Sequence, residues 1–132
     1  PNYLISAALT LIMAQRLARK TCLECRAIDE NITPKLLNSI GFSPEQSSRA
    51  KIHKGTGCQE CSGSGYKGRM GIYEILEIDN ELKAGILSNL QQTELNAIAK
   101  KNGFRTMQDM GQDLLLSGDL SFAEYERVLQ SN

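Results

Sequence analysis

The chain of 132 residues contains four cysteines, and they form two Cys-x-x-Cys pairs, Cys22–Cys25 and Cys58–Cys61. A Cys-x-x-Cys turn can direct two thiolates at one metal ion, and two such turns supply the four sulfurs of a tetrahedral structural zinc site. The metal would close the 32 residues between the pairs into a loop, so its binding would contribute directly to the free energy of folding. The spacing therefore predicts one structural zinc ion bound by all four cysteines.

Other uses of these residues stay open at this point. Two disulfides would suit an oxidising compartment, although Pro1-Asn2-Tyr3 does not open a secretory signal of basic and then apolar residues. A thiol redox enzyme is a weaker alternative, because two matched pairs are more than one active site needs. His53 is the single histidine, and we expect it at the surface because four thiolates already complete a zinc shell.

Composition and charge exclude several classes of protein. Aromatic residues make up 5% of the chain and tryptophan is absent, so the core must be aliphatic. No segment approaches the ~20 apolar residues that a membrane-spanning helix needs. Residues 1–72 hold ten Lys or Arg and five Asp or Glu, and residues 73–132 hold the reverse. The resulting net charge of zero argues against a dedicated nucleic-acid-binding domain, which usually carries a basic excess.

Apolar periodicity and capping residues predict an α+β fold that is mostly helical. A long helix is predicted over 4–20, and shorter helices are predicted after Thr33-Pro34 and Ser43-Pro44. Alternation predicts strands over 49–54 and 69–78, which would form a hairpin or a three-stranded element around the zinc site. Further helices that start at Asp79, Thr93, Thr106 and Ser121 would form a C-terminal helical cap.

A glycine-rich segment surrounds the second cysteine pair, with five glycines between Gly55 and Gly68. Glycine tolerates positive φ, so this backbone can wrap a metal and direct N–H groups at the sulfurs. The segment also matches the G-x-G-x-x-G pattern of dinucleotide-binding proteins. That pattern follows a strand and opens a helix, whereas this segment follows a cysteine pair and precedes a strand, so we reject nucleotide binding here.

Basic residues flank both cysteine pairs, and a metal that joined the pairs would bring them together. We expect Arg16, Arg19 and Arg69 to form one cationic edge. Such an edge could bind phosphate or an acidic partner, or contact a neighbouring subunit. The simpler alternative is a rim of solvated arginines with little energetic effect.

Two blocks of sequence resemble the hexameric ATPases that power type II secretion and type IV pilus assembly. The first is LIMAQRLARKTC at residues 11–22, and the second is GCQECSGSGYKGRMGIYE at residues 57–74. The tail from Gly103 through Gly118 to Glu124 is also similar to the end of those proteins. The resemblance implies a C-terminal region with three parts: a terminal helix of the ATPase lobe (1–21), a tetracysteine zinc-binding subdomain (22–78) and a C-terminal helical subdomain (79–132).

The family's nucleotide-binding motifs, including the phosphate loop, would lie upstream of these blocks. The resemblance therefore implies that ATP and Mg²⁺ bind elsewhere in a longer protein, and no catalytic or nucleotide-binding residue is assigned here. It also implies a hexamer at the cytoplasmic face of the inner membrane, working on a membrane platform protein to assemble pilins or pseudopilins. The alternative from another class is a free-standing zinc ribbon that binds nucleic acid or protein.

Overall fold

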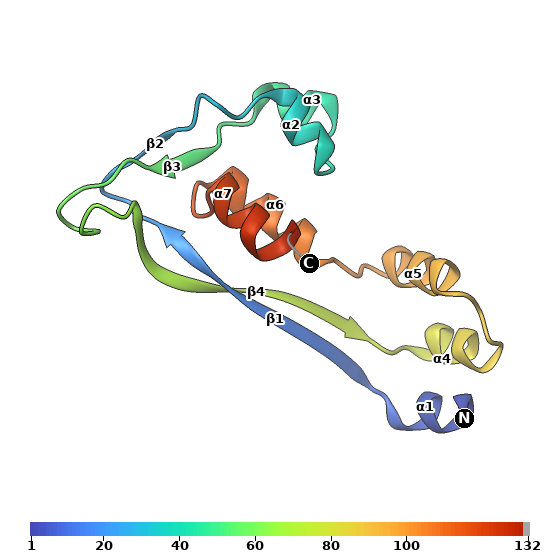
Figure 1. Ribbon diagram of the computed structural model, residues 1–132. Helices are drawn as coiled ribbons and strands as arrows, with labels where there is room; N and C mark the ends of the chain where they lie inside the picture. The colour runs from blue at the N-terminus through green and yellow to red at the C-terminus, as the bar shows by residue number, and fades with distance from the viewer. Residues whose placement is uncertain (131–132) are drawn as a thin grey trace. The chain divides into compact units, whose positions relative to one another are not determined.

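The computed structural model describes residues 1–130, and they form two compact units, each built from separated stretches of chain. The first unit comprises 1–15 and 73–106, and the second comprises 16–72 and 107 onward. Seven α-helices, four strands and one π-helical turn make up the described chain (Figure 1). The α+β class with a helical majority is therefore confirmed.

The strands form two sheets of two strands each. β1 (Leu11–Thr21) pairs with β4 (Tyr66–Glu77), and β2 (Arg26–Ile28) pairs with β3 (His53–Gly55). The backbone N–H of Cys22 donates to the carbonyl of Gly65 at the end of β1, and that of Ile78 donates to Thr10 at its start, so β1 and β4 are antiparallel. β2 and β3 are antiparallel as well, with Arg26 opposite Gly55.

The helix predicted over 4–20 is wrong for most of its length. The chain forms a short helix, α1 (Asn2–Ala8), and then the strand β1. Residues 11–20 favour helix by intrinsic propensity, but β4 is a 12-residue strand whose backbone groups need a partner, and β1 supplies it. Pairing with β4 overrides the intrinsic helix preference of these residues, because that preference amounts to only roughly a few tenths of a kcal/mol per residue.

The strand predicted over 69–78 is confirmed, and its two faces differ as the alternation predicts. Ile72 and Ile78 are buried on one face, whereas Tyr73 and Ile75 are exposed on the other. The predicted pairing is wrong: β3 pairs with β2 rather than with β4, and it starts only at His53 because α3 extends to Arg49.

Short helices with clear caps cover the second unit. The helices α2 (Pro34–Ser39) and α3 (Pro44–Arg49) begin after the predicted caps, and Ser43 forms a reciprocal capping box with Gln46. α6 (Met107–Ser117) ends at Gly118, whose φ of +84° suits glycine. α7 (Phe122–Tyr125) continues as the π-helical turn η1 (Glu126–Gln130).

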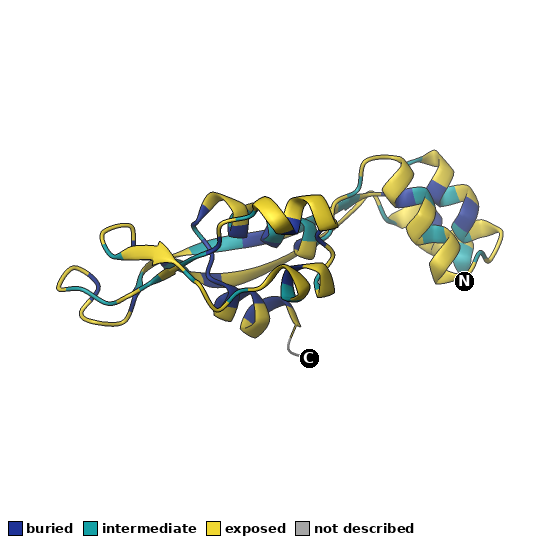
Figure 2. Ribbon diagram, turned by 90° about the horizontal axis from the view of Figure 1, so that it is seen from above, coloured by how far each residue is buried: buried dark blue, intermediate teal, exposed yellow. Residues whose placement is uncertain are grey.

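The core of the second unit is mostly aliphatic and includes three aromatic residues. Figure 2 shows its buried residues in dark blue. Ile72 and Leu115 are fully buried in it, and Tyr125 stacks against Phe122 with ring centroids 6.2 Å apart. The other buried members come from most elements of this unit: Ala18, Leu37, Phe42, Ile52, Met107, Leu120, Val128 and Leu129.

The first unit is smaller and is built around α1, α4 (Asn80–Leu87) and α5 (Gln92–Lys101). The buried members of its hydrophobic core are Ile78, Leu82 and Ala99. Asp79 caps α4 as predicted, because its carboxylate accepts from the N–H of Leu82 at 2.9 Å. The cap predicted at Thr93 is wrong, since α5 begins two residues earlier after Gln91.

Among residues 1–130, the structure contains no helix that is both long and apolar enough to cross a membrane.

Candidate metal centre

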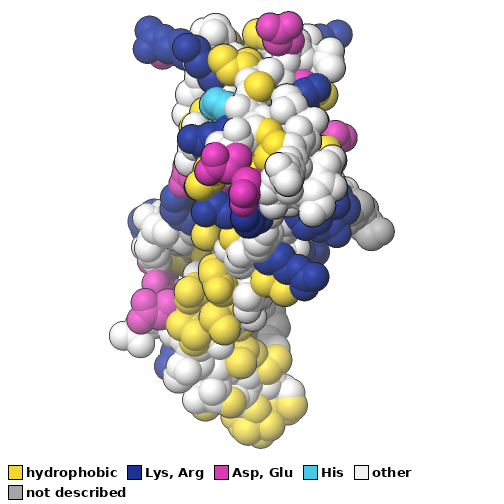
Figure 3. All heavy atoms as spheres, turned by 90° about the vertical axis from the view of Figure 1, so that its left-hand side faces the viewer, with side chains coloured by type: hydrophobic (Ala, Val, Ile, Leu, Met, Phe, Trp, Pro, Cys, Tyr) yellow, Lys and Arg dark blue, Asp and Glu magenta, His cyan; other side chains and the backbone are white. Residues whose placement is uncertain are grey.

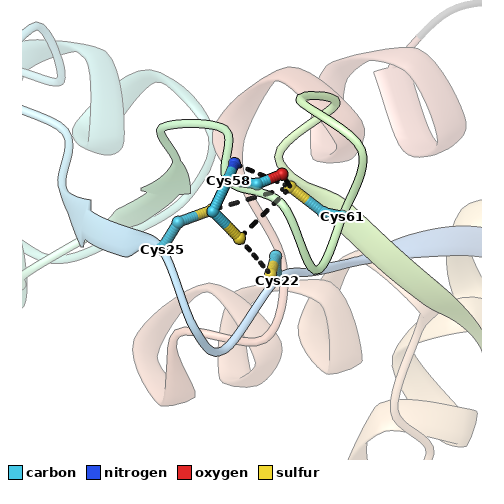
Figure 4. A group of neighbouring side chains, drawn as sticks. All are labelled: Cys22, Cys25, Cys58 and Cys61. Carbon is cyan, nitrogen blue, oxygen red and sulfur yellow. Dashed lines mark hydrogen bonds between the residues drawn. The ribbon is translucent and has the colours of Figure 1, made fainter.

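Two loops bring the four cysteines together. Cys22 directly follows β1, and Cys25 lies in the turn that leads into β2. Cys58 and Cys61 lie in the loop that joins β3 to β4. The pairing of β1 with β4 and of β2 with β3 therefore carries both loops to one place, where the side chains converge (Figure 4).

Three of the six sulfur–sulfur distances have the length of a tetrahedral edge. All four Sγ atoms lie within 4.8 Å of one another. Cys22 Sγ is 3.7 Å from Cys58 Sγ, Cys25 Sγ is 3.8 Å from Cys61 Sγ, and Cys58 Sγ is 3.7 Å from Cys61 Sγ. A zinc ion with four sulfurs at about 2.3 Å requires an edge of about 3.8 Å between them. The donor set can therefore hold one metal ion of this kind.

The same distances are too long for disulfides, whose sulfurs lie about 2.05 Å apart. All four thiols are free. His53 contributes no ligand to the cluster, and it is half-buried rather than at the surface as predicted. Its Nδ1 is shielded from solvent and has no hydrogen-bond partner among residues 1–130.

Backbone N–H groups from the glycine-rich segment point at the sulfurs, as predicted. Gly57 donates to Cys25 Sγ, and Gly65 donates to Cys61 Sγ, each at 3.2 Å. Gly65 has a φ of +82°, and a Cβ there would lie 2.6 Å from the carbonyl oxygen of Gly55. Only glycine fits at this position, and the loop depends on it to bring its N–H to the sulfur.

These hydrogen bonds also favour the ionised form of the Cys61 thiol. Burial raises the pKa of the Cys61 thiol, but N–H groups of Cys58 and Gly65 outweigh it and bring the pKa from 9.0 down to about 6. At Cys58 a backbone hydrogen bond with Cys61 lowers the pKa, but burial and the neighbouring thiols outweigh it and raise the value to about 11. A metal binds thiolates, so its affinity will fall as the pH falls.

The arginines predicted to form a cationic edge have different partners. Arg16 donates to the carbonyl of Val128 in η1. Arg19 binds the fully buried carboxylate of Glu124 at 2.7 Å, and its guanidinium lies 4.2 Å above the ring of Tyr66. Arg69 is exposed on β4. Arg16 and Arg19 therefore tie β1 to the C-terminal helices.

Glu124 is the functional residue that the sequence analysis missed. The capping-box pattern assigned it to the start of α7, and Ser121 does cap that helix through the N–H of Glu124. The Glu124 carboxylate, however, accepts from the backbone N–H, Nε and Nη2 of Arg19 and from Nε and Nη2 of Arg127. Its partner Arg19 lies 105 positions away, so no local pattern could reveal the pair.

This network has a predictable pH dependence. Burial raises the pKa of Glu124, but hydrogen bonds from Arg127 and Arg19 outweigh it and lower the pKa from 4.5 to about 2. Because the folded-state pKa is depressed, the stabilisation is complete above pH 4.5 and is lost as the pH falls toward 2.

We expect the difference in unfolding free energy between the wild type and Glu124→Gln to shrink as the pH falls from 4.5 toward 2. Metal loss at acid pH affects both proteins and cancels in that difference, which chemical denaturation would measure. A difference independent of pH would contradict this assignment.

The chain is similar in sequence to proteins of one family. Residues 1–127 match the family described as "Type II/IV secretion system protein". The chain is 36% identical over 120 residues to the type IV pilus assembly ATPase PilB of Thermus thermophilus, and the match covers 91% of this chain and 13% of the relative. It is 34% identical to PilB of Pseudomonas aeruginosa, covering 97% of this chain and 22% of the relative.

A relative named for type II secretion has a similar sequence identity to this chain. The putative type II secretion system protein E of Escherichia coli K12 is 34% identical over 135 residues, which cover 96% of this chain and 25% of that protein. The chain thus spans a quarter or less of the length of these relatives. Because the family match takes in both cysteine loops and extends through α7, the chain belongs to the type II/IV secretion system protein family.

Proposed function

We propose that this chain is the zinc-stabilised C-terminal part of a secretion or pilus assembly ATPase, and that it couples ATP hydrolysis performed elsewhere in the protein to the assembly of pilins or pseudopilins. The observation that carries the proposal is the cluster of Cys22, Cys25, Cys58 and Cys61, whose sulfurs all lie within 4.8 Å of one another, with three of the distances at 3.7 to 3.8 Å. Zinc is the metal that favours four thiolates in a closed tetrahedron without redox chemistry.

The role proposed for zinc is to hold two loops in register. The metal would join the end of β1 to the start of β4 and would anchor β2 and β3 beside them. Motion of the strand pair would then pass to the C-terminal helices through Arg16 and Arg19, which are bound to η1 and α7. The proposal divides the chain into a terminal segment of the ATPase lobe (1–21), a zinc-binding subdomain (22–78) and a C-terminal helical subdomain (79–132).

The working assembly would be a hexamer of the ATPase, peripheral at the cytoplasmic face of the inner membrane and in contact with a platform protein. The names of the relatives refer to type IV pilus assembly and to type II secretion, and either process is compatible with the proposal. A subunit contact through Arg16, Arg19 and Arg69 is a weaker part of it, because the first two are already bound within the chain. A nucleic-acid-binding ribbon is disfavoured by the net charge of zero.

The chain by itself should not turn over ATP. It contains no G-x-x-x-x-G-K-[S/T] segment, whose backbone would cradle the phosphates of the nucleotide. We expect no phosphate release above background by the purified, zinc-loaded chain. Steady ATP hydrolysis that persists through repurification would contradict both this expectation and the division of labour in the proposal.

The proposal is tested in the full-length protein with Cys58→Ser, and with Gln59→Ala as the matched control. Gln59 is exposed between the two cysteines of the second pair, so its loss leaves the donor set intact. We expect the Cys58→Ser protein to lose zinc and to lose pilus assembly or secretion activity while it still binds nucleotide. The Gln59→Ala protein should keep its zinc and its activity. Full assembly activity in a Cys58→Ser protein that contains no metal would refute the proposed role.

A further inference from the structure

The first unit contains a small, largely apolar cavity. Its volume is about 210 Å³, and its apolar lining includes Leu11, Ile75, Leu76 and Phe104. Leu11 and Ile75 are each 52% exposed, so part of this lining faces solvent. Small-molecule sites commonly have volumes of roughly 300 to 1,000 Å³. The cavity is therefore small for a cofactor, and its size suits one or two side chains of a protein partner.

Two carboxylates at this cavity lack a cationic partner. Glu77 and Asp79 both line it, and neither forms an ion pair among residues 1–130. Asp79 accepts hydrogen bonds from two neutral groups, the N–H of Leu82 and the side-chain amide of Asn102, whereas Glu77 is exposed. No Lys or Arg of the described chain lines the cavity. The cavity therefore suits an apolar side chain that has a positive charge beside it.

The second unit carries a surface with these two properties. Leu17 on β1 is 54% exposed. Arg69 on β4 is also exposed, and it has no ion pair with any residue that the structure describes. Both side chains line one hollow of the second unit, so an apolar group and a positive charge lie near each other. Figure 3 views the side of the molecule that carries the cysteine loops and shows Lys and Arg side chains gathered across the middle of this face.

We propose that Leu17 and Arg69 of one copy of this chain bind the cavity in the first unit of a second copy. Leu17 would enter the apolar cavity, and the Arg69 guanidinium would pair with the exposed Glu77 carboxylate. The basic excess of residues 1–72 and the acidic excess of residues 73–132 favour such a contact between copies. Because the two surfaces differ, the contact is heterologous and links copies head to tail, as in a ring. The inference names a subunit contact of the proposed hexamer, so it rests on that part of the proposed function.

Charge exchange in the full-length protein tests the proposal. Glu77→Arg alone would place two arginines at the contact, and Arg69→Glu alone would place two carboxylates there. Each variant should therefore raise the protein concentration needed for half-maximal assembly by about tenfold or more, as measured by analytical ultracentrifugation. An equimolar mixture of the two variants should assemble like the wild type, because each positive surface then meets a negative surface on the other variant.

Glu94→Arg is the matched control, and it should assemble like the wild type. Glu94 is an exposed glutamate of the first unit that lies outside the cavity and has no ion pair within residues 1–130. Normal assembly of both single variants would overturn the inference. A mixture that stays unassembled would also overturn it and would assign the cavity to another occupant, such as a part of the longer protein outside this chain. A wild-type protein that does not self-associate would count instead against the proposed hexamer.

Discussion

Replacing Cys25 with serine is expected to unfold the metal-binding part of the second unit. Structural zinc sites contribute about 10 kcal/mol or more in small domains, which exceeds the total stability of many of them. The strands β2 and β3 are three residues each, so they hold little structure without the metal. Hydrogen exchange should therefore lose protection from residue 22 to residue 65.

The effect should spread unequally over the rest of the chain. The helices α4 and α5 belong to the first unit and have their own core around Leu82 and Ala99, so they should keep their protection. The helices α6 and α7 pack in the second unit with Ile52 and Leu37, and they should lose part of theirs. The region that keeps its protection should therefore be limited to the helices of the first unit.

Chelation and re-addition of zinc provide the control for this experiment. A strong chelator should reproduce the exchange pattern of Cys25→Ser in the wild type, and added zinc should reverse it there but not in the variant. Unchanged protection across residues 22–65 in the chelated wild type would show that the metal is dispensable for folding.

Replacing Glu124 with glutamine is expected to cost about 3 kcal/mol of unfolding free energy, the scale reported for breaking a buried ion pair. The carboxylate is fully buried and receives both Arg19 and Arg127, whereas an amide offers one acceptor oxygen and adds two donors. The loss would detach α7 from β1, and it should appear as a lower midpoint in chemical denaturation of the zinc-loaded chain.

Glu126→Gln is the matched control, because this glutamate lies two residues later and is exposed. The same change in charge there should alter stability by only a few tenths of a kcal/mol, about the size of most surface substitutions. Equal destabilisation by the two variants would mean that net charge matters and the buried network does not.

Local sequence patterns predicted much of the fold. Thr33, Ser43, Asp79 and Ser121 cap helices where the pattern predicts them, because a cap is determined by neighbours within a few residues. The alternation correctly predicted the strand β4, in which Ile72 is buried and its neighbour Tyr73 is exposed. The position of the cysteine cluster also followed from spacing alone, since a metal site of four thiolates leaves few alternatives.

The predictions from sequence were wrong where residues far apart in the chain determine the structure. Residues 11–20 have a helical pattern, yet they form β1 because β4, more than 40 residues away, needs a strand partner. Glu124 has the spacing of a capping residue, yet its carboxylate binds Arg19 near the other end of the chain. The pairing of β3 with β2 likewise depends on where the two cysteine loops meet, which no local pattern contains.

The most direct test of the account is X-ray absorption at the zinc edge, combined with elemental analysis of the reduced chain. The account predicts one zinc ion per chain, surrounded by four sulfurs at about 2.3 Å and by no nitrogen or oxygen ligand. That result would match the three sulfur–sulfur distances of 3.7 to 3.8 Å in the structure. A site with fewer sulfurs, or a zinc-free chain that keeps its fold with the cysteines paired as disulfides, would contradict it.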